Sequence, residues 1–287
     1  MKKQYVFVYG TLRKHESNHY LLKGAELIAS QCWTAGRLYD SHCGYPFLAR
    51  SQSSRVYGEL YQVNDTQMRA LDHLEGYYGP EKNNLYDRSL QEVYTDQGIY
   101  QAFVYVLPNG KQFKSMAEIK SGDWCIDRLL QQKQSLFYFA YGSCMDTKRF
   151  EEAGVSHFFQ NVKGRGILKD YQLAFTRKSR DGGRADIVEK GGTVEGKVYE
   201  IPKAALEYLY RREGVNAGCY RPTLIDVEFY GTILKNILTF VVKDKEEETS
   251  PPMHYVNEIL QGGTGLLSDS YMEKVKTNLR NNFNIHV

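Results

Sequence analysis

Apolar and polar residues alternate over short stretches along most of this chain. The apolar runs are short, rich in Tyr and Val, and separated by Gly or Asn, a pattern typical of half-buried strands. The 23 tyrosines agree with this, because aromatic residues favour strands. We therefore expect an α+β protein in which curled sheets or small mixed β-barrels carry a few short helices.

Two stretches, 65–76 and 202–214, have apolar residues at helical rather than strand spacing. Asp65 fits a capping position, Pro202 fits a first helical position, and each stretch ends in a glycine that fits a C-terminal stop. A glutamate directly precedes that glycine in both stretches. The two predicted helices therefore end on Glu75 and Glu213.

The chain contains a tandem duplication. Residues 5–12 and 137–145 are both apolar strands that run into Tyr-Gly-Thr or Tyr-Gly-Ser. Residues 56–63 also resemble residues 194–201. When this second alignment is extended along the chain without a gap, it places Glu75 opposite Glu213. Because two blocks agree in order and spacing, duplication is the economical interpretation.

A boundary between the two copies is expected near residues 131–135. A short helical pattern there passes into a polar, Gln-rich stretch, which is typical of a linker. We therefore expect two domains, residues 1–130 and 136–287. At 287 residues the chain is long enough for both to bury a core.

Charge and cysteine content exclude several classes of function. The net charge of +3, from 37 basic and 34 acidic side chains, is too small for a nucleic-acid binder. Five widely spaced cysteines without a C-x-x-C motif indicate neither a zinc site nor a disulfide framework, so a reducing cytoplasm is expected. No apolar run approaches about 18 residues, and no membrane association is predicted.

The repeated motifs have two possible readings each. A strand that ends in Tyr-Gly-Ser or Tyr-Gly-Thr leaves backbone N–H groups free to hold a carboxylate or oxyanion, although the same sequence also makes ordinary tight turns. A glutamate at a helix C-terminus has its pKa raised by the helix dipole and by burial, as a general base requires, although most such carboxylates are solvated. The recurrence of both motifs favours the chemical reading.

Both halves resemble known cyclotransferases. The second half is similar to γ-glutamylcyclotransferase through several ordered motifs. These are residues 137–145, 182–187, 194–199, 212–214 and 251–255. The first half is similar to the γ-glutamylamine cyclotransferase and AIG2-like branch, through residues 8–12, 44–46, Gly58, 75–77, Tyr86 and Arg88.

The resemblance implies a reaction without metal or cofactor on a small γ-glutamyl compound. The substrate's α-amino group attacks its own γ-carbonyl, which forms 5-oxoproline and releases an amine or amino acid. The implied proton acceptors are Glu213 in the second half and Glu75 in the first. The implied substrate-binding residues are Tyr138, Phe139, Ala140, Tyr141, Gly142, Ser143 and Tyr255 in the second half, and Tyr9, Gly10, Thr11 and Leu12 in the first.

We expect the second half to be the active one, with the first a related copy that is degenerate or differently selective. Cys144 stands where family members commonly carry Asn, which puts substrate orientation in doubt. A nucleophilic Cys144 is disfavoured, because the implied reaction needs no covalent step. Two alternatives stay open: both halves are ligand-binding modules, or the first half is a structural partner. The sequence assigns neither the leaving group nor the oligomeric state.

Overall fold

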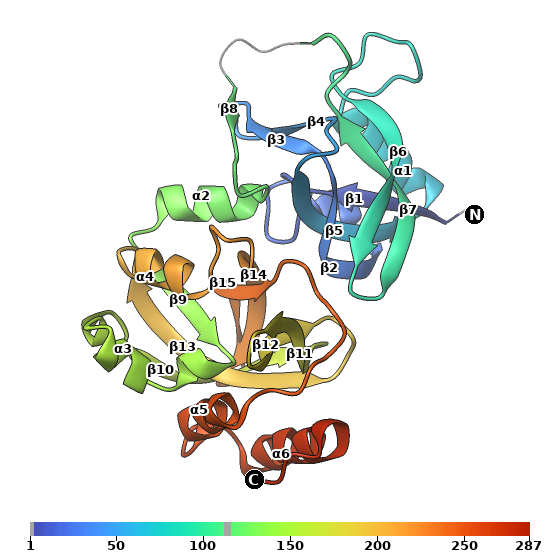
Figure 1. Cartoon of the computed structure of the whole chain (residues 1–287). Helices are drawn as coiled ribbons and strands as arrows, with labels where there is room; N and C mark the ends of the chain where they lie inside the picture. The colour runs from blue at the N-terminus through green and yellow to red at the C-terminus, as the bar shows by residue number, and fades with distance from the viewer. Residues whose placement is uncertain (1–2, 112–115) are drawn as a thin grey trace. The chain divides into compact units, whose positions relative to one another are not determined.

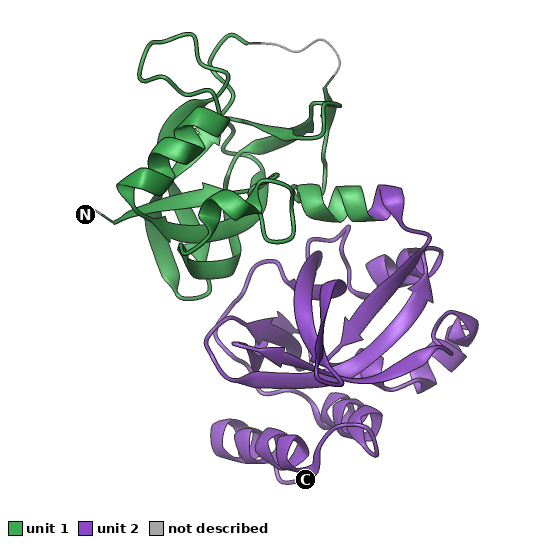
Figure 2. Ribbon diagram, turned by 180° about the vertical axis from the view of Figure 1, so that it is seen from behind, with its two compact units in different colours: residues 1–129 green, residues 130–287 purple. Residues whose placement is uncertain are grey.

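The computed structural model describes residues 3–111 and 116–287. The chain divides into two compact units, residues 1–129 (unit 1) and 130–287 (unit 2), shown in different colours in Figure 2. Helix α2 (Trp124–Gln132) carries the chain from one unit into the next. No helix in the described ranges is long and apolar enough to cross a membrane.

Unit 1 is built on a closed five-stranded barrel (Figure 1). Around the barrel the strands follow the order β1 (Gln4–Val8), β5 (Arg55–Val63), β2 (Glu26–Ala35), β6 (Asp87–Thr95) and β7 (Gly98–Val106). Strands β1 and β7 are parallel and close it, while the other pairs are antiparallel. The remaining elements are a 3-10 turn (His19–Leu22), helix α1 (Asp65–Leu74), and a small sheet of β3 (Arg37–Asp40), β4 (Pro46–Ala49) and β8 (Ala117–Glu118).

Unit 2 repeats this barrel strand for strand. Its strands are β9 (Ser135–Ala140), β13 (Thr193–Pro202), β10 (Val162–Lys169), β14 (Tyr220–Phe229) and β15 (Thr232–Val242), again in that order and closed by a parallel pair. Helix α4 (Ala205–Arg212) follows β13 as α1 follows β5. The additional elements are α3 (Lys148–Glu152), the hairpin β11 (Gln172–Ser179) and β12 (Gly182–Val188), α5 (Met253–Gly263) and α6 (Asp269–Phe283), with 3-10 turns at Ser143–Met145 and Ser156–Phe158. The predicted tandem α+β duplication is therefore confirmed.

The two barrels share their strand register as well as their order. Phe7 pairs with Leu60 in unit 1, and Phe139 pairs with Val198 in unit 2. These are the pairs that the sequence repeat aligns. The turns that follow β1 and β9 therefore lie at equivalent places in the two barrels. Each turn lines a cavity together with the C-terminal end of a short helix, α1 in unit 1 and α4 in unit 2.

Gly58 lies at the closest approach of β5 to β1. A Cβ atom there would lie 2.2 Å from the carbonyl oxygen of Val8 and 2.8 Å from the Phe7 ring, and the equivalent Gly196 is equally crowded. Because one of these neighbours is a backbone atom, the clash can be relieved only by moving a strand. We expect Gly58→Ala to lower the free energy of unfolding by roughly 1–3 kcal/mol, measured by urea denaturation. An unchanged denaturation midpoint would show that the strands separate freely here.

Both predicted helix ends are confirmed, and both predicted beginnings are wrong. Gly76 and Gly214 each follow a helix with φ of +60°, which glycine adopts without strain. The α1 cap is Asn64, not Asp65, because its side chain and that of Gln67 satisfy each other's backbone N–H groups. Pro202 ends β13, where the strand terminus tolerates its missing N–H, and α4 begins at Ala205.

Candidate active site

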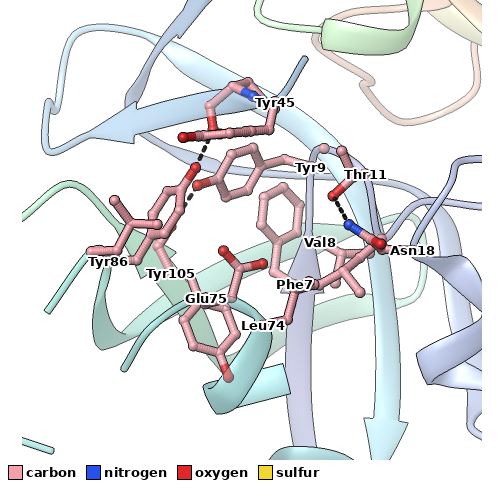
Figure 3. Close-up of a pocket in the computed structure, with 14 residues that line it drawn as sticks. Phe7, Val8, Tyr9, Thr11, Asn18, Tyr45, Leu74, Glu75, Tyr86 and Tyr105 are labelled. Carbon is pink, nitrogen blue, oxygen red and sulfur yellow. Dashed lines mark hydrogen bonds between the residues drawn. The ribbon is translucent and has the colours of Figure 1, made fainter. Parts of the chain in front are cut away.

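Unit 1 contains a cavity of about 200 Å³ between the end of β1, the end of α1 and the start of β4. Figure 3 shows Glu75 with its carboxylate directed into this space, below the rings of Tyr9 and Tyr86. The turn after β1, residues 10–12, forms one side of the cavity. A water occupies about 30 Å³ in the liquid, so the cavity has room for a small organic group rather than for one or two waters.

Glu75 is the acidic group of this cavity. It caps the C-terminus of α1, where the helix dipole disfavours a negative charge. No side chain or backbone group in the described part of the chain donates a hydrogen bond to its carboxylate. Burial without a compensating cation raises the pKa of Glu75 to about 8. The group is therefore poised to exchange a proton near neutral pH.

Four tyrosines line the cavity around Glu75: Tyr9, Tyr45, Tyr86 and Tyr105. The Tyr9 hydroxyl donates to the Tyr105 carbonyl oxygen (2.7 Å), and the Tyr86 hydroxyl donates to that of Pro46 (2.8 Å). Because these phenols are bonded to backbone, they fix the rings in place and leave apolar surface facing the cavity. That surface keeps water away from the carboxylate and accounts for its high pKa.

The turn after β1 presents unpaired backbone donors. The N–H groups of Gly10, Thr11 and Leu12 have no acceptor within the described residues, whereas the N–H of Arg13 closes the turn onto the Gly10 carbonyl oxygen (3.0 Å). The Thr11 side chain accepts a hydrogen bond from Asn18 (3.0 Å). Consecutive free N–H groups of this kind make a concave site for an anion or a developing oxyanion.

All five residues predicted from the first half line this one cavity: Tyr9, Gly10, Thr11, Leu12 and Glu75. Sequence reasoning named Tyr45 and Tyr86 only as parts of motifs and missed Asn18 and Tyr105. These come from other segments of the chain, and no local pattern marks them. Tyr105 could be found only by aligning the two barrels strand by strand, which places it opposite Phe240.

Unit 2 reproduces the framework of this site. The Tyr141 hydroxyl donates to the Phe240 carbonyl oxygen (2.6 Å), and the Tyr220 hydroxyl donates to that of Ala185 (2.7 Å). Glu213 caps α4 as Glu75 caps α1. The N–H groups of residues 142–144 again have no acceptor in the part of the chain that the structure describes.

The interior of the unit 2 site is occupied by side chains. The cavity is only about 30 Å³, about the share of one water. The Cys144 thiol donates to Glu213 (Sγ–Oε1 3.2 Å), while the Arg212 guanidinium donates to Cys144 Sγ (3.0 Å) and to Ser143 Oγ (2.9 Å). The equivalents in unit 1 are the apolar Leu12 and Leu74. The carboxylate of Glu213 is therefore engaged, whereas that of Glu75 is free.

These contacts also set the ionisation of the unit 2 groups. Burial raises the pKa of Glu213, and Arg212 and the Cys144 hydrogen bond oppose that rise. Burial raises the pKa of Cys144 to about 12, so its thiol stays protonated near neutral pH. A protonated, buried thiol is a hydrogen-bond donor here and a poor nucleophile.

Six of the predicted unit 2 residues line the small cavity, and two do not. Those that line it are Tyr138, Tyr141, Gly142, Ser143, Glu213 and Tyr255. Tyr255 comes from α5, and its hydroxyl accepts a hydrogen bond from the Ala185 N–H (3.1 Å). Phe139 and Ala140 lie within β9, and the Phe139 ring packs in the core beside Gly196 instead of facing a ligand.

Comparison with known proteins gives consistent matches in both units. Residues 6–126 match the family model described as gamma-glutamyl cyclotransferase, AIG2-like, and residues 193–275 match the AIG2-like family model. The putative gamma-glutamylcyclotransferase YkqA of Bacillus subtilis is 42% identical over 276 residues, 96% of each chain. Its crystal structure superposes with a TM-score of 0.88 and covers 98% of both chains. Gamma-L-glutamyl-butirosin B gamma-glutamyl cyclotransferase of Niallia circulans is 34% identical over 46% of this chain and 85% of its own.

Proposed function

The chain belongs to the AIG2-like γ-glutamyl cyclotransferase family, and we propose that it converts γ-glutamyl compounds into 5-oxoproline in the unit 1 cavity. Glu75 is the proton acceptor of this reaction. The substrate is a small γ-glutamyl compound, and the other product is an amine or amino acid. The observation that carries the proposal is an unpaired carboxylate of raised pKa that faces a cavity large enough for a ligand.

The reaction exchanges one amide bond for another. The substrate's α-amino nitrogen bonds to its γ-carbonyl carbon, and the bond from that carbon to the leaving amine breaks. Two protons leave the α-ammonium nitrogen as it becomes the ring amide N–H. Glu75 accepts them in turn and passes both to the departing nitrogen, which leaves as an ammonium group. Holding the chain so that its own amine reaches the γ-carbonyl supplies the entropic part of the rate enhancement.

The pKa of Glu75 suits this proton transfer. An α-ammonium group has an ordinary pKa of roughly 8, and that of Glu75 is about 8. A transfer between groups of similar pKa is nearly balanced in free energy, which favours general-base catalysis. The free N–H groups of residues 10–12 are the proposed donors to the γ-carbonyl oxygen as negative charge develops on it.

Sequence reasoning favoured Glu213 as the principal base, and the geometry favours Glu75. Cyclisation in unit 2 requires the Cys144 thiol to leave Glu213 first, and it requires a cavity larger than about 30 Å³. We therefore assign most of the turnover to unit 1, with Glu213 as the base of a slower second site. A purely ligand-binding role for both units is not favoured, because the relatives are named as cyclotransferases.

The pH dependence of kcat/KM tests the role of Glu75. Its carboxylate must be ionised to accept a proton, so activity should rise with pH along a limb with an apparent pKa near 8. The measurement is kcat/KM across this range with one γ-glutamyl substrate. A rising limb near pH 4–5 instead would indicate a solvated carboxylate as the base.

A further inference from the structure

Arg13 directly follows the turn of residues 10–12, the donor turn of unit 1, and its guanidinium is buried. Its side chain is 5% exposed, and it bonds to two buried carboxylates. Nε donates to Glu59 Oε1 (3.2 Å), and Nη1 donates to Asp123 Oδ1 (2.7 Å). None of these three residues lines the cavity, and the proposed reaction does not use them.

The two carboxylates fix three segments of unit 1 to one another. Glu59 belongs to β5, and its second oxygen accepts the backbone N–H of Lys14 (2.9 Å). Asp123 precedes α2, and its Oδ1 also accepts the N–H groups of Cys125 (3.0 Å) and Ile126 (3.2 Å) in the first turn of that helix. The guanidinium therefore connects the donor turn to a barrel strand and to a helix.

The residues that follow the donor turn hold its backbone in place. Its N–H groups are free to meet a ligand because they make no hydrogen bonds of their own, so other contacts must fix the backbone. The backbone bonds that do so come from the residues that follow, Arg13 N–H to Gly10 (3.0 Å) and Asn18 N–H to Thr11 (2.9 Å). Arg13 thus closes the turn with its backbone and anchors it with its side chain.

Unit 2 shows that the fold itself does not require this ion pair. Met145, fully buried, stands at the position of Arg13 and closes the equivalent turn onto Gly142. Lys197 stands at the position of Glu59 and donates to the Met145 carbonyl oxygen. Burying three charged groups carries a large desolvation cost that an apolar residue avoids. Retaining this arrangement beside the open cavity indicates a role in geometry rather than in stability.

We infer that Arg13 is a positioning residue, which holds the N–H groups of residues 10–12 in place for the oxyanion through Glu59 and Asp123. This inference rests on the proposed function of unit 1. It concerns the transition state more than substrate binding, because the oxyanion develops only as the ring closes.

The test is Arg13→Met, which introduces the residue that unit 2 has at this position. We expect kcat to fall roughly 10- to 100-fold, with KM changed less than about threefold, since a donor displaced by about 1 Å loses that much rate. The rising limb of the pH profile should keep its pKa, because Arg13 does not contact Glu75. Arg128→Met is the matched control: Arg128 joins the same helix to Glu16, outside the donor turn, and kcat should be retained.

Asp123→Asn is the second variant, for the case in which loss of the buried cation unfolds unit 1. It keeps the oxygen that caps α2 and weakens only the ion pair, so a smaller fall in kcat, roughly 3- to 10-fold, is expected. Folded Arg13→Met and Asp123→Asn proteins with wild-type kcat would overturn the inference while leaving the proposed function intact. A wild-type protein that forms no 5-oxoproline would remove both.

Discussion

Replacing Glu75 with Gln is expected to lower kcat for 5-oxoproline formation by roughly 100- to 10,000-fold, the usual contribution of general-base catalysis. Gln keeps the shape of the side chain, but its amide has no basic oxygen to accept the α-ammonium proton. The measurement is steady-state formation of 5-oxoproline by the purified full-length protein. Glu81→Gln, an exposed glutamate in the same segment, is the control and should keep wild-type kcat. Loss of less than about tenfold in Glu75→Gln would exclude Glu75 as the base.

The same substitution is expected to stabilise unit 1 at alkaline pH. The folded-state pKa of Glu75, about 8, lies above its ordinary value of 4.5, so the folded protein holds this proton more tightly than the unfolded chain does. The stability associated with the protonated carboxyl is therefore complete below pH 4.5 and is lost as pH rises towards 8. Each unit of pKa shift corresponds to about 1.4 kcal/mol, which sets an upper limit near 5 kcal/mol.

We expect Glu75→Gln to unfold with a free energy roughly 2–4 kcal/mol above that of the wild type at pH 9, and with little difference at pH 5, because Gln never ionises. Urea denaturation at the two pH values measures this, with Glu81→Gln again as the control. Equal stability of Glu75→Gln and wild type at both pH values would mean that water solvates the Glu75 carboxylate. A gain in stability together with a loss of turnover is the expected signature of a residue retained for chemistry.

The fold was largely predictable from the sequence because its signals are local and occur twice. Alternating strands gave the α+β class, and the repeat gave two equivalent barrels whose register the structure reproduces. Helix ends were predictable because glycine at positive φ is a strong stop. Helix beginnings were not, because the reciprocal bonds of Asn64 with Gln67 and the strand pairing of Pro202 with Ser135 outweighed single-residue preferences.

The candidate site was predictable only where its residues are adjacent in sequence or repeated. The donor turns and the two glutamates follow this rule. Phe139 and Ala140 were included because the family resemblance implies a binding loop over residues 138–143, but the strand directs the Phe139 ring into the core. The engagement of Glu213 was not predictable, because it depends on tertiary packing that brings Cys144 and Arg212 together across the unit 2 site. Neither the composition of the chain nor the spacing of its motifs predicts whether side chains fill a pocket.

The two units place different side chains at equivalent positions of one framework. In unit 1, Leu12 and Leu74 leave the carboxylate without partners, so its pKa is high and the cavity is open. In unit 2, Cys144 and Arg212 occupy the equivalent positions and bind each other. A few side chains at matching positions therefore decide which copy of the fold is ready for a substrate.

The most direct measurement is a mass-spectrometric time course of 5-oxoproline from γ-glutamyl dipeptides, γ-glutamylamines and glutathione. It compares the wild type with Glu75→Gln and Glu213→Gln, each verified as folded. We predict that the wild type forms 5-oxoproline from at least one substrate, that Glu213→Gln keeps most of this activity, and that Glu75→Gln loses it. Activity that survives in Glu75→Gln and disappears in Glu213→Gln would place the working site in unit 2 and contradict the assignment to unit 1. Absence of product from every substrate would contradict cyclotransferase activity itself.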